Sequence, residues 1–156
     1  MIEYKSLDKE KIDFFQKDLI ELFTNSFNSS FPNEKFEEEF IIQKVEQCIS
    51  FYDKGEAFVI CAYDTNKNII CGLIYFYEKQ ERNNKIIHLN HIAVKKEYQK
   101  QGIATELISR MEKYAKENKI SKISLDVTLE NKSAVLLYKK LHFKEIRMHM
   151  EKDTII

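Results

Sequence analysis

Glycine and proline are scarce in this chain of 156 residues, which has three glycines and one proline. These residues are typical of linkers and turns, so their scarcity argues against a flexible connection between two domains. The weakest point is the polar stretch at residues 26–33, SFNSSFPN, which is typical of a loop between two helices. No internal repeat or low-complexity segment is present. We therefore expect residues 1–156 to form a single domain with a substantial core.

The sequence has no excess charge of either sign, because 25 basic residues balance 25 acidic ones. Non-specific nucleic-acid binding requires surplus Lys and Arg to neutralise phosphates, so we expect no nucleic-acid partner. Long apolar runs are also missing, since none approaches the ~18 residues of a membrane span. The first residues, MIEYKSLDKEK, lack the apolar core of a signal peptide. These absences predict a soluble cytoplasmic protein without a membrane partner.

Paired cysteines are absent as well. Cys48, Cys61 and Cys71 are odd in number, and no two of them form a CxxC pair. Cys61 and Cys71 lie in apolar, strand-like stretches, which favours buried free thiols in a reducing compartment. No neighbouring base is evident, so we expect none of the three to act as a nucleophile.

The first third of the chain predicts a short strand at residues 1–6 followed by two helices. The first helix begins at the capping residue Asp8 and carries apolar residues at helical spacing. The second spans about residues 33–50, and its first turns are rich in glutamate. A charge run of this kind is usually a solvated face, and the functional alternative is a rim that attracts a cationic substrate. The residues concerned are Ile12, Phe15, Leu19, Leu22, Phe23 and Phe27 in the first helix, and Glu34, Glu37, Glu38 and Glu39 in the second.

The middle of the chain predicts three strands that pair as an antiparallel meander, with a polar turn at residues 64–68. The second half alternates strand, helix, strand, helix and strand, which requires a crossover and a parallel strand pair. We therefore expect an α/β mixed sheet, mostly antiparallel, with helices on both faces. The predicted strands are residues 56–63, 69–78, 85–94, 121–128 and 143–152, and the later helices are residues 102–118 and 131–141.

The segment at residues 91–105, HIAVKKEYQKQGIAT, passes from an apolar strand through a polar turn into a helix near Gly102. The first turn of a helix has N–H groups without intrahelical acceptors, and they carry the positive end of the dipole. Such a junction binds phosphate oxygens well, and Gly102 lets the backbone approach an anion. Most such turns bind nothing, however, and both the P-loop and the GxGxxG pattern are absent.

The turn QKQGIA at residues 99–104 resembles the [QR]-x-x-G-x-[GA] motif of the GNAT superfamily of N-acetyltransferases. This resemblance implies the GNAT-like acyl-CoA N-acyltransferase fold, with acetyl-CoA as co-substrate and no metal. It also implies that the turn binds the pyrophosphate of coenzyme A through backbone amides, and that the preceding strand binds the pantetheine arm. The residues assigned to the cofactor are Ile92, Ala93, Val94, Gln99, Lys100, Gln101, Gly102, Ile103, Ala104, Thr105, Asn131 and Tyr138.

A second segment, NKSAVLLYKKLHF at residues 131–143, resembles the family signature N-x-x-A-x-x-[LF]-Y-x-[KR]-x-G-F. Asn131 would cap the helix, and Tyr138 lies two turns later on the same side. Taken alone, Tyr138 would be interpreted as a core aromatic, but two motifs in the right order favour a functional residue. His142 stands where the family usually has glycine, which would suit a left-handed helix C-cap. Histidine reaches that conformation at some cost.

The resemblance implies direct attack of an amine on the acetyl thioester, without an acyl-enzyme. Tyr138 would protonate the departing thiolate, because a phenol with a pKa of ~10 keeps its proton at neutral pH. A backbone N–H near Val94 would stabilise the carbonyl oxygen.

The general base is left open by the sequence. His88 lies near the position where some family members have a catalytic carboxylate, and an imidazole pKa of ~6.5 suits proton abstraction. Side-chain alternation predicts that His88 and Asn90 share a face with Ile92, while His91 points the other way. Either histidine could simply pack at the sheet surface, and ordered water could be the immediate proton acceptor.

Three functions therefore compete. The first is acetyl transfer to a primary amine, either a small molecule such as a polyamine, amino sugar or amino acid, or a protein N-terminus or lysine. The second is a non-catalytic domain that binds acyl-CoA and reports it to a partner, against which Tyr138 argues weakly. The third is an interaction module without a ligand. Acyl-chain length and oligomeric state stay open, although the resemblance makes a homodimer worth testing.

Overall fold

The computed structural model describes residues 1–155 and contains a five-stranded sheet in the order β1-β2-β3-β4-β5. Neighbouring strands from β1 to β4 pair antiparallel, whereas β4 and β5 pair parallel. The predicted antiparallel meander and parallel pair are therefore confirmed. The strands are β1 (Ile2–Ser6), β2 (Phe58–Asp64), β3 (Ile69–Glu81), β4 (Asn84–Val94) and β5 (Ile123–Leu125).

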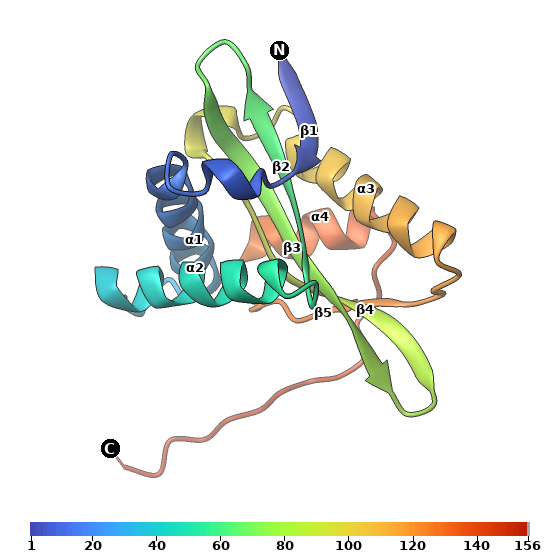
Figure 1. Cartoon of the computed structure of the whole chain (residues 1–156). Coiled ribbons are helices and arrows are strands. Elements are labelled where there is room, and N and C mark those ends of the chain that lie inside the picture. Colours follow the sequence, from blue (N-terminus) through green and yellow to red (C-terminus); the bar gives the residue numbers. More distant parts are fainter. Residues whose placement is uncertain (156) are drawn as a thin grey trace.

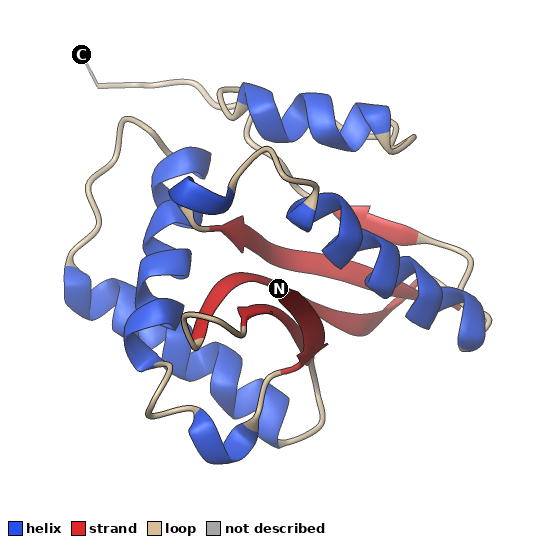
Figure 2. Ribbon diagram, turned by 90° about the horizontal axis from the view of Figure 1, so that it is seen from above, coloured by secondary structure: helices blue, strands red, loops and turns tan. Residues whose placement is uncertain are grey.

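Helices cover both faces of this sheet, as Figures 1 and 2 show. The cover is needed because residues 70–76 of β3 are all buried, and a strand buried on both faces must be packed from two sides. One core lies between the sheet and the first two helices, and a second lies between the sheet and the last two. The helices are α1 (Gln16–Ser30), α2 (Glu38–Asp53), α3 (Ile103–Glu117) and α4 (Lys132–Lys140), with 3₁₀ turns η1 (Lys9–Lys11) and η2 (Lys96–Tyr98).

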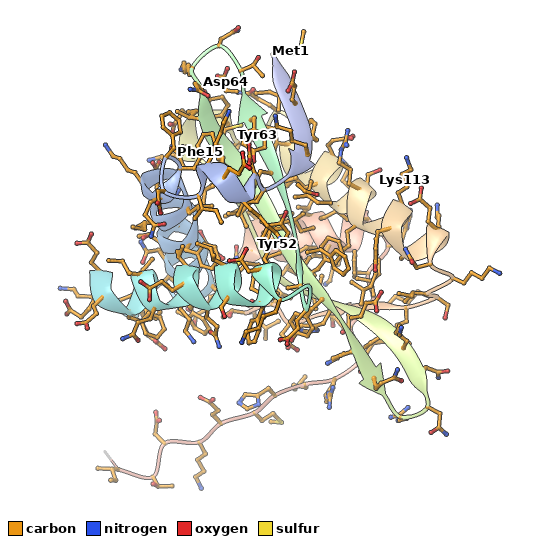
Figure 3. All side chains as sticks on the ribbon, in the orientation of Figure 1. Met1, Phe15, Tyr52, Tyr63, Asp64 and Lys113 are labelled. Carbon is orange, nitrogen blue, oxygen red and sulfur yellow. The ribbon has the colours of Figure 1, made fainter. Side chains whose placement is uncertain are left out.

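The segment predicted as one helix from Asp8 is divided in the structure. Asp8 does cap a helical turn, because its Oδ1 accepts the Glu10 N–H at 3.0 Å, but that turn is only η1. The chain then bends before α1, and Phe15 packs edge-on against Tyr63 with ring centroids 5.5 Å apart (Figure 3). The prediction of a continuous helix was wrong because this contact with β2 outweighs local helical periodicity.

The last predicted strand, residues 143–152, is not formed, and the strand predicted at residues 121–128 shortens to β5. Ile146, Met148 and Met150 are 89%, 73% and 81% exposed, and the tail leads away from the sheet (Figures 1 and 3). Alternation makes a segment able to form a strand, but a strand also needs a partner with free backbone groups. The three residues of β5 offer little edge for such pairing.

Candidate active site

A β-bulge divides β4 at Asn90. Tyr75 of β3 pairs with His91, but the next residue, Phe76, pairs with Leu89. Asn90 is therefore the extra residue that has no partner in β3. A bulge bends the strand and reverses the phase of side-chain alternation beyond it.

The bulge places the two histidines of β4 on the same face of the sheet. His88 lies across from Tyr77 and His91 across from Tyr75, which both contribute to the core under α1 and α2. Ile92 contributes to the opposite core, under α3 and α4. The prediction that His91 points away from Ile92 is confirmed, but the prediction that His88 shares a face with Ile92 was wrong, because simple alternation does not include the extra residue.

The parallel ladder between β4 and β5 stops one residue before the bulge, at the pair Leu89–Leu125. From Asn90 to Val94 that edge of β4 has no neighbouring strand among residues 1–155. Free backbone groups along a strand edge can bind an extended ligand by sheet-like hydrogen bonds. The Val94 carbonyl is engaged within the chain, because Gln99 Nε2 donates to it at 3.1 Å.

The turn between η2 and α3 presents a row of unused donors. The N–H groups of residues 100–105 meet no backbone acceptor among residues 1–155, and the first intrahelical bond runs from Glu106 N–H to Gly102 O at 3.0 Å. Lys100 and Gly102 are left-handed, with φ of 62° and 84°. A Cβ on Gly102 would meet nothing within 4 Å, so the backbone at this position combines a positive φ with open space in front of it. Six N–H groups at a helix N-terminus fit an anion.

The assigned cofactor residues surround this turn and edge with mixed exposure. Most of the turn is open to solvent, while its first helical residue anchors it in the core. Among them, Gln99, Lys100, Gln101, Gly102 and Thr105 are exposed, Ile92, Ala93, Val94, Ala104 and Asn131 are half-buried, and Ile103 and Tyr138 are buried.

A buried cation that the sequence did not reveal holds the start of the turn. Lys95 is 5% exposed, and its ammonium contacts the carboxylates of Asp18 and Glu21 in α1. Burial lowers the pKa of Lys95, but the hydrogen bonds to the two carboxylates outweigh it and the pKa lies above its ordinary value. Asp18 also accepts the Ile70 N–H of β3 at 3.1 Å. A single lysine after a strand gives no sequence signal, because its partners lie far away in the chain.

The end of α4 holds Tyr138 in place through a cap centred on His142. His142 is left-handed with φ 71°, its N–H donates to Lys139 O at 3.0 Å, and Phe143 N–H donates to Tyr138 O at 2.9 Å. These two bonds form a Schellman motif. An apolar contact usually accompanies this motif, between the side chains at the positions that Tyr138 and Phe143 occupy here. Here Phe143 packs edge-on against Tyr138, with ring centroids 5.7 Å apart. His142 therefore forms the left-handed cap that glycine would suit, at the cost expected for a residue with a Cβ.

The ring of Tyr138 is buried, but its hydroxyl reaches solvent. The residue is 8% exposed and joins the core that contains Ile92, Val94 and Ile103. No buried side-chain oxygen in residues 1–155 lacks a partner, and no hydrogen bond perturbs this phenol, so the oxygen itself must be accessible. Burial of the ring raises the pKa of Tyr138 to about 12.

Asn131 stands directly before α4, as predicted for a cap. Its side chain makes no capping hydrogen bond, and its Oδ1 instead accepts from Ser133 Oγ at 3.5 Å. The position is therefore confirmed, whereas the expected capping interaction is absent.

His88 is bound to β5. Its Nδ1 lies 2.9 Å from Ser124 Oγ, and its Nε2 lies 3.8 Å from an Asp126 carboxylate oxygen. Burial, followed by the charge of Lys79, lowers the pKa of His88 below its ordinary value. The imidazole is therefore largely neutral at pH 7.

His91 lies among aromatic rings. Its centroid is 4.8 Å from that of Phe23 and 5.1 Å from that of Phe27, and its Nδ1 lies 3.0 Å from Ser26 Oγ. Burial, followed by the charge of Lys44, lowers the pKa of His91 to about 4. This histidine is neutral throughout the physiological range.

A cavity of about 760 Å³ lies between β3 and β4 on one side and α1 and α2 on the other. It reaches Asn90 and His91, where the free edge of β4 begins, but His88 and Tyr138 do not line it. Glu34 lines the cavity, whereas Glu37, Glu38 and Glu39 are exposed elsewhere, as a solvated face would be.

The site thus combines a free strand edge, a turn with unused N–H groups and a neighbouring cavity, and comparison with known proteins shows the family of the chain. Residues 17–143 match the Acetyltransferase (GNAT) family. The chain belongs to this family. The turn at residues 99–104 and the segment around Tyr138 both fall within the matched residues, and the predicted GNAT family is confirmed.

One curated relative of this GNAT chain is an N-alpha-acetyltransferase from Saccharolobus solfataricus, which is 39% identical over 62 residues. That match spans 39% of this chain and only 37% of the relative.

Solved structures share the fold over nearly the whole chain. A possible acetyltransferase from Clostridium difficile 630 has a TM-score of 0.75 at 17% identity and covers 100% of this chain and 99% of its own. A predicted acetyltransferase from Clostridium acetobutylicum, solved with acetyl-CoA, has a TM-score of 0.73 at 16% identity, with coverage of 98% and 96%. An aminoglycoside antibiotic 6′-N-acetyltransferase from Acinetobacter haemolyticus has a TM-score of 0.71 at 19% identity, with 99% coverage of both chains.

Besides the buried Lys95, two further features of the GNAT site were not predicted from its sequence. The aromatic lining of the cavity had a weak signal, because Phe23 and Phe27 of α1 and Phe31 directly after it recur four residues apart. The bulge at Asn90 had no sequence signal.

No helix within residues 1–155 has the length and apolar character that a membrane crossing requires.

Proposed function

We propose that this chain is an N-acetyltransferase that transfers the acetyl group of acetyl-CoA to a primary amine by direct attack in a ternary complex. The observation that carries the proposal is the row of six unused N–H groups at residues 100–105, next to the free edge of β4. The negative diphosphate of coenzyme A complements the N–H groups, and its extended amide-bearing arm can form sheet-like hydrogen bonds with the free edge of β4.

The chain's own residues divide the binding work. The N–H groups around Gly102 would hold the diphosphate oxygens, with Lys100 adding positive charge nearby. Backbone groups of Ile92 and Val94 would bind the pantetheine amides, and an N–H on the same edge would stabilise the carbonyl oxygen as charge develops on it. The ion pairs of Lys95 with Asp18 and Glu21 of α1 would fix the backbone that joins this edge to the turn.

The reaction forms a C–N bond between the amine nitrogen and the acetyl carbon and breaks the C–S bond of the thioester. The sulfur leaves with the bonding electrons and takes a proton. Tyr138 would give that proton, because its raised pKa keeps the phenol protonated and its oxygen reaches solvent. The thiolate becomes more basic in the same apolar surroundings, which favours the transfer.

The ammonium group of the acceptor must lose a proton before it attacks. His88 would receive it through water, since its imidazole is neutral at pH 7 and its Nδ1 is already fixed by Ser124. His91 is the weaker candidate, because a base with a pKa of about 4 takes a proton from an ammonium with difficulty.

These roles are tested by comparing turnover with coenzyme A binding in Tyr138→Phe and His88→Gln. We expect Tyr138→Phe to lower kcat by about 100-fold or more and His88→Gln to lower kcat/KM by about tenfold, because general acid–base groups contribute on this scale. The dissociation constant for CoA, measured by calorimetry, should change less than about twofold because both variants leave the anion-binding turn intact.

Tyr4→Phe is the matched control, because Tyr4 lies on β1, at the opposite end of the sheet from β4, and does not line the cavity. An unchanged kcat in Tyr138→Phe would remove the acid assignment. Failure of the wild-type protein to bind CoA would remove the proposed function itself.

A further inference from the structure

The cavity beside β4 is lined mainly by aromatic side chains. Half of its sixteen lining residues are phenylalanine or tyrosine, and six of the eleven phenylalanines in the chain lie here. Phe31 remains 40% exposed although it lies in this cluster. Apolar surface held open on the wall of a cavity of about 760 Å³ is typical of a small-molecule site.

The rings form one connected wall centred on Phe27. The centroid of Phe27 lies 5.2 Å from that of Phe36, 5.3 Å from that of Phe40 and 6.5 Å from that of Phe31. Phe36 and Phe40 stack on each other at 5.4 Å. These rings come from α1, α2 and the loop between them, so the wall faces β3 and β4 across the cavity.

The charged groups of the cavity favour a cation. Three carboxylates line it against one ammonium, that of Lys44, which lies over the Phe40 ring at 5.3 Å. One of the carboxylates, Glu78, already accepts the Tyr114 hydroxyl, which leaves Glu34 and Glu56. His91 adds no positive charge, because burial keeps it neutral.

The bulge at Asn90 fixes the direction of the ligand. Asn90 and His91 line the cavity, and the free edge of β4 begins at the same residue. An amine nitrogen at the bulge would therefore lie beside an acetyl group held along the edge, while the rest of the acceptor would extend toward the wall of rings.

We infer, on the basis of the proposed function, that the acceptor is a primary amine attached through a short chain to an aromatic or large apolar group. Two sources share this chemistry: a small arylalkylamine, and a peptide N-terminus whose first side chain is aromatic or large and apolar. A polyhydroxylated amino sugar fits poorly, because its hydroxyls would lose water against rings that cannot hydrogen-bond with them. A polyamine would leave the wall of rings without an apolar partner.

The inference is tested by release of free CoA thiol with a matched series of amines. The series contains 2-phenylethylamine, ethylamine, spermidine, an aminoglycoside, and two short peptides that begin with Phe or Ser. We expect kcat/KM for 2-phenylethylamine or the Phe peptide to exceed that for ethylamine or the Ser peptide by about tenfold or more. Whichever of 2-phenylethylamine and the Phe peptide has the higher kcat/KM identifies the source of the acceptor. A higher kcat/KM for spermidine or the aminoglycoside than for both aromatic amines would overturn the inference.

A variant pair separates the cavity from the rest of the molecule. Phe36→Ala should lower kcat/KM for the preferred aromatic amine by about tenfold and leave that for ethylamine nearly unchanged, because only the larger group contacts the wall. Phe14→Ala is the control, since Phe14 is 63% exposed and does not line the cavity. Equal losses for both amines in Phe36→Ala would overturn the inference.

Calorimetry distinguishes failure of this inference from failure of the proposed function. If 2-phenylethylamine binds, Phe36→Ala weakens that binding and no amine is acetylated, the aromatic amine site stands and the transferase proposal fails. If amines are acetylated without preference for an aromatic group, the transferase stands and the inference fails. If 2-phenylethylamine neither binds nor reacts and the Phe peptide does neither, the inference also fails.

Discussion

The histidines of β4 show how the surroundings of a residue set its chemistry. His88 and His91 lie on the same face of the sheet, three positions apart. The ring of His88 meets polar groups of Ser124 in β5 and of Asp126 directly after it, whereas the ring of His91 lies close to Phe23 and Phe27. Only the second histidine has a pKa near 4, because apolar neighbours penalise its charged form most strongly.

His91 should therefore make the stability of the protein depend on pH. Its folded pKa of about 4 lies below the ordinary 6.5, so between these values the unfolded chain binds a proton that the folded chain does not. The free energy of unfolding is unaffected by His91 above pH 6.5 and falls as the pH drops toward 4. We expect this histidine to account for a loss of about 2 kcal/mol between pH 7 and pH 5.

Urea denaturation of the wild type and of His91→Phe at both pH values measures this contribution. The phenylalanine keeps the aromatic packing and cannot titrate. Between pH 7 and pH 5 the unfolding free energy of His91→Phe should therefore fall by about 2 kcal/mol less than that of the wild type. Equal losses in the two proteins would mean that His91 is more solvated than its contacts indicate.

At the scale of elements, helix ends depend on left-handed residues that the sequence supplies mostly without glycine. The helices α2, α3 and α4 end in the same pair of hydrogen bonds, centred on Gly55, Lys119 and His142. Lysine and histidine accept this backbone at a cost that glycine avoids. The scarcity of glycine therefore did not prevent these caps, but the cap at Lys119 gave no glycine signal in the sequence.

Gly102 at the start of α3 offers a sharper test. Gly102→Ala should lower the free energy of unfolding by about 1 kcal/mol, because alanine is strained at a φ of 84°. It should also weaken CoA binding by about tenfold or more, because the added Cβ enters the space where the diphosphate would approach the backbone.

The matched control is Gly55→Ala at the end of α2. Gly55 has a φ of 73°, and a Cβ on it also meets nothing within 4 Å, so the cost in stability should be similar. Its CoA affinity should equal that of the wild type. Equal weakening of CoA binding by both substitutions would show that the turn before α3 is not the anion site.

At the scale of the whole molecule, the tail beyond α4 is attached to the domain only through its first residues. Phe143 packs on Tyr138, and Lys139 pairs with Glu145 at 2.7 Å, which lowers the pKa of that carboxyl. The apolar residues that follow are exposed, and Figure 3 shows their side chains standing clear of the sheet.

Removal of the tail should therefore leave the fold intact. A chain that ends at Glu145 should keep its Tm within about 2 °C of the wild type, because little packing is lost. A chain that ends at Leu141 should melt several degrees lower, since it loses the contact of Phe143 with Tyr138 and the cap at His142. A large decrease in Tm in the chain that ends at Glu145 would show that residues 146–155 pair as the strand that their alternation predicts.

The features that the sequence determined by itself are those encoded over short distances. Strand alternation, helical spacing and the order of elements predicted the meander, the parallel crossover and the helices on both faces. The strand–turn–helix junction around Gly102 was also predicted, because it depends on the backbone of a few consecutive residues. Binding at that turn and the roles of Tyr138 and His88 stay predictions.

Tertiary structure alone decided the features that depend on partners far away in the chain. The bulge at Asn90 arises from how β4 pairs with β3, and the charge of Lys95 depends on carboxylates that α1 brings to it. The cavity lies where rings from α1, α2 and the loop between them pack on one another across from β3 and β4. The tail had the pattern of a strand but no adequate edge to pair with. Periodicity can indicate which residues a face would bury, but only the assembled neighbours decide whether that face is covered.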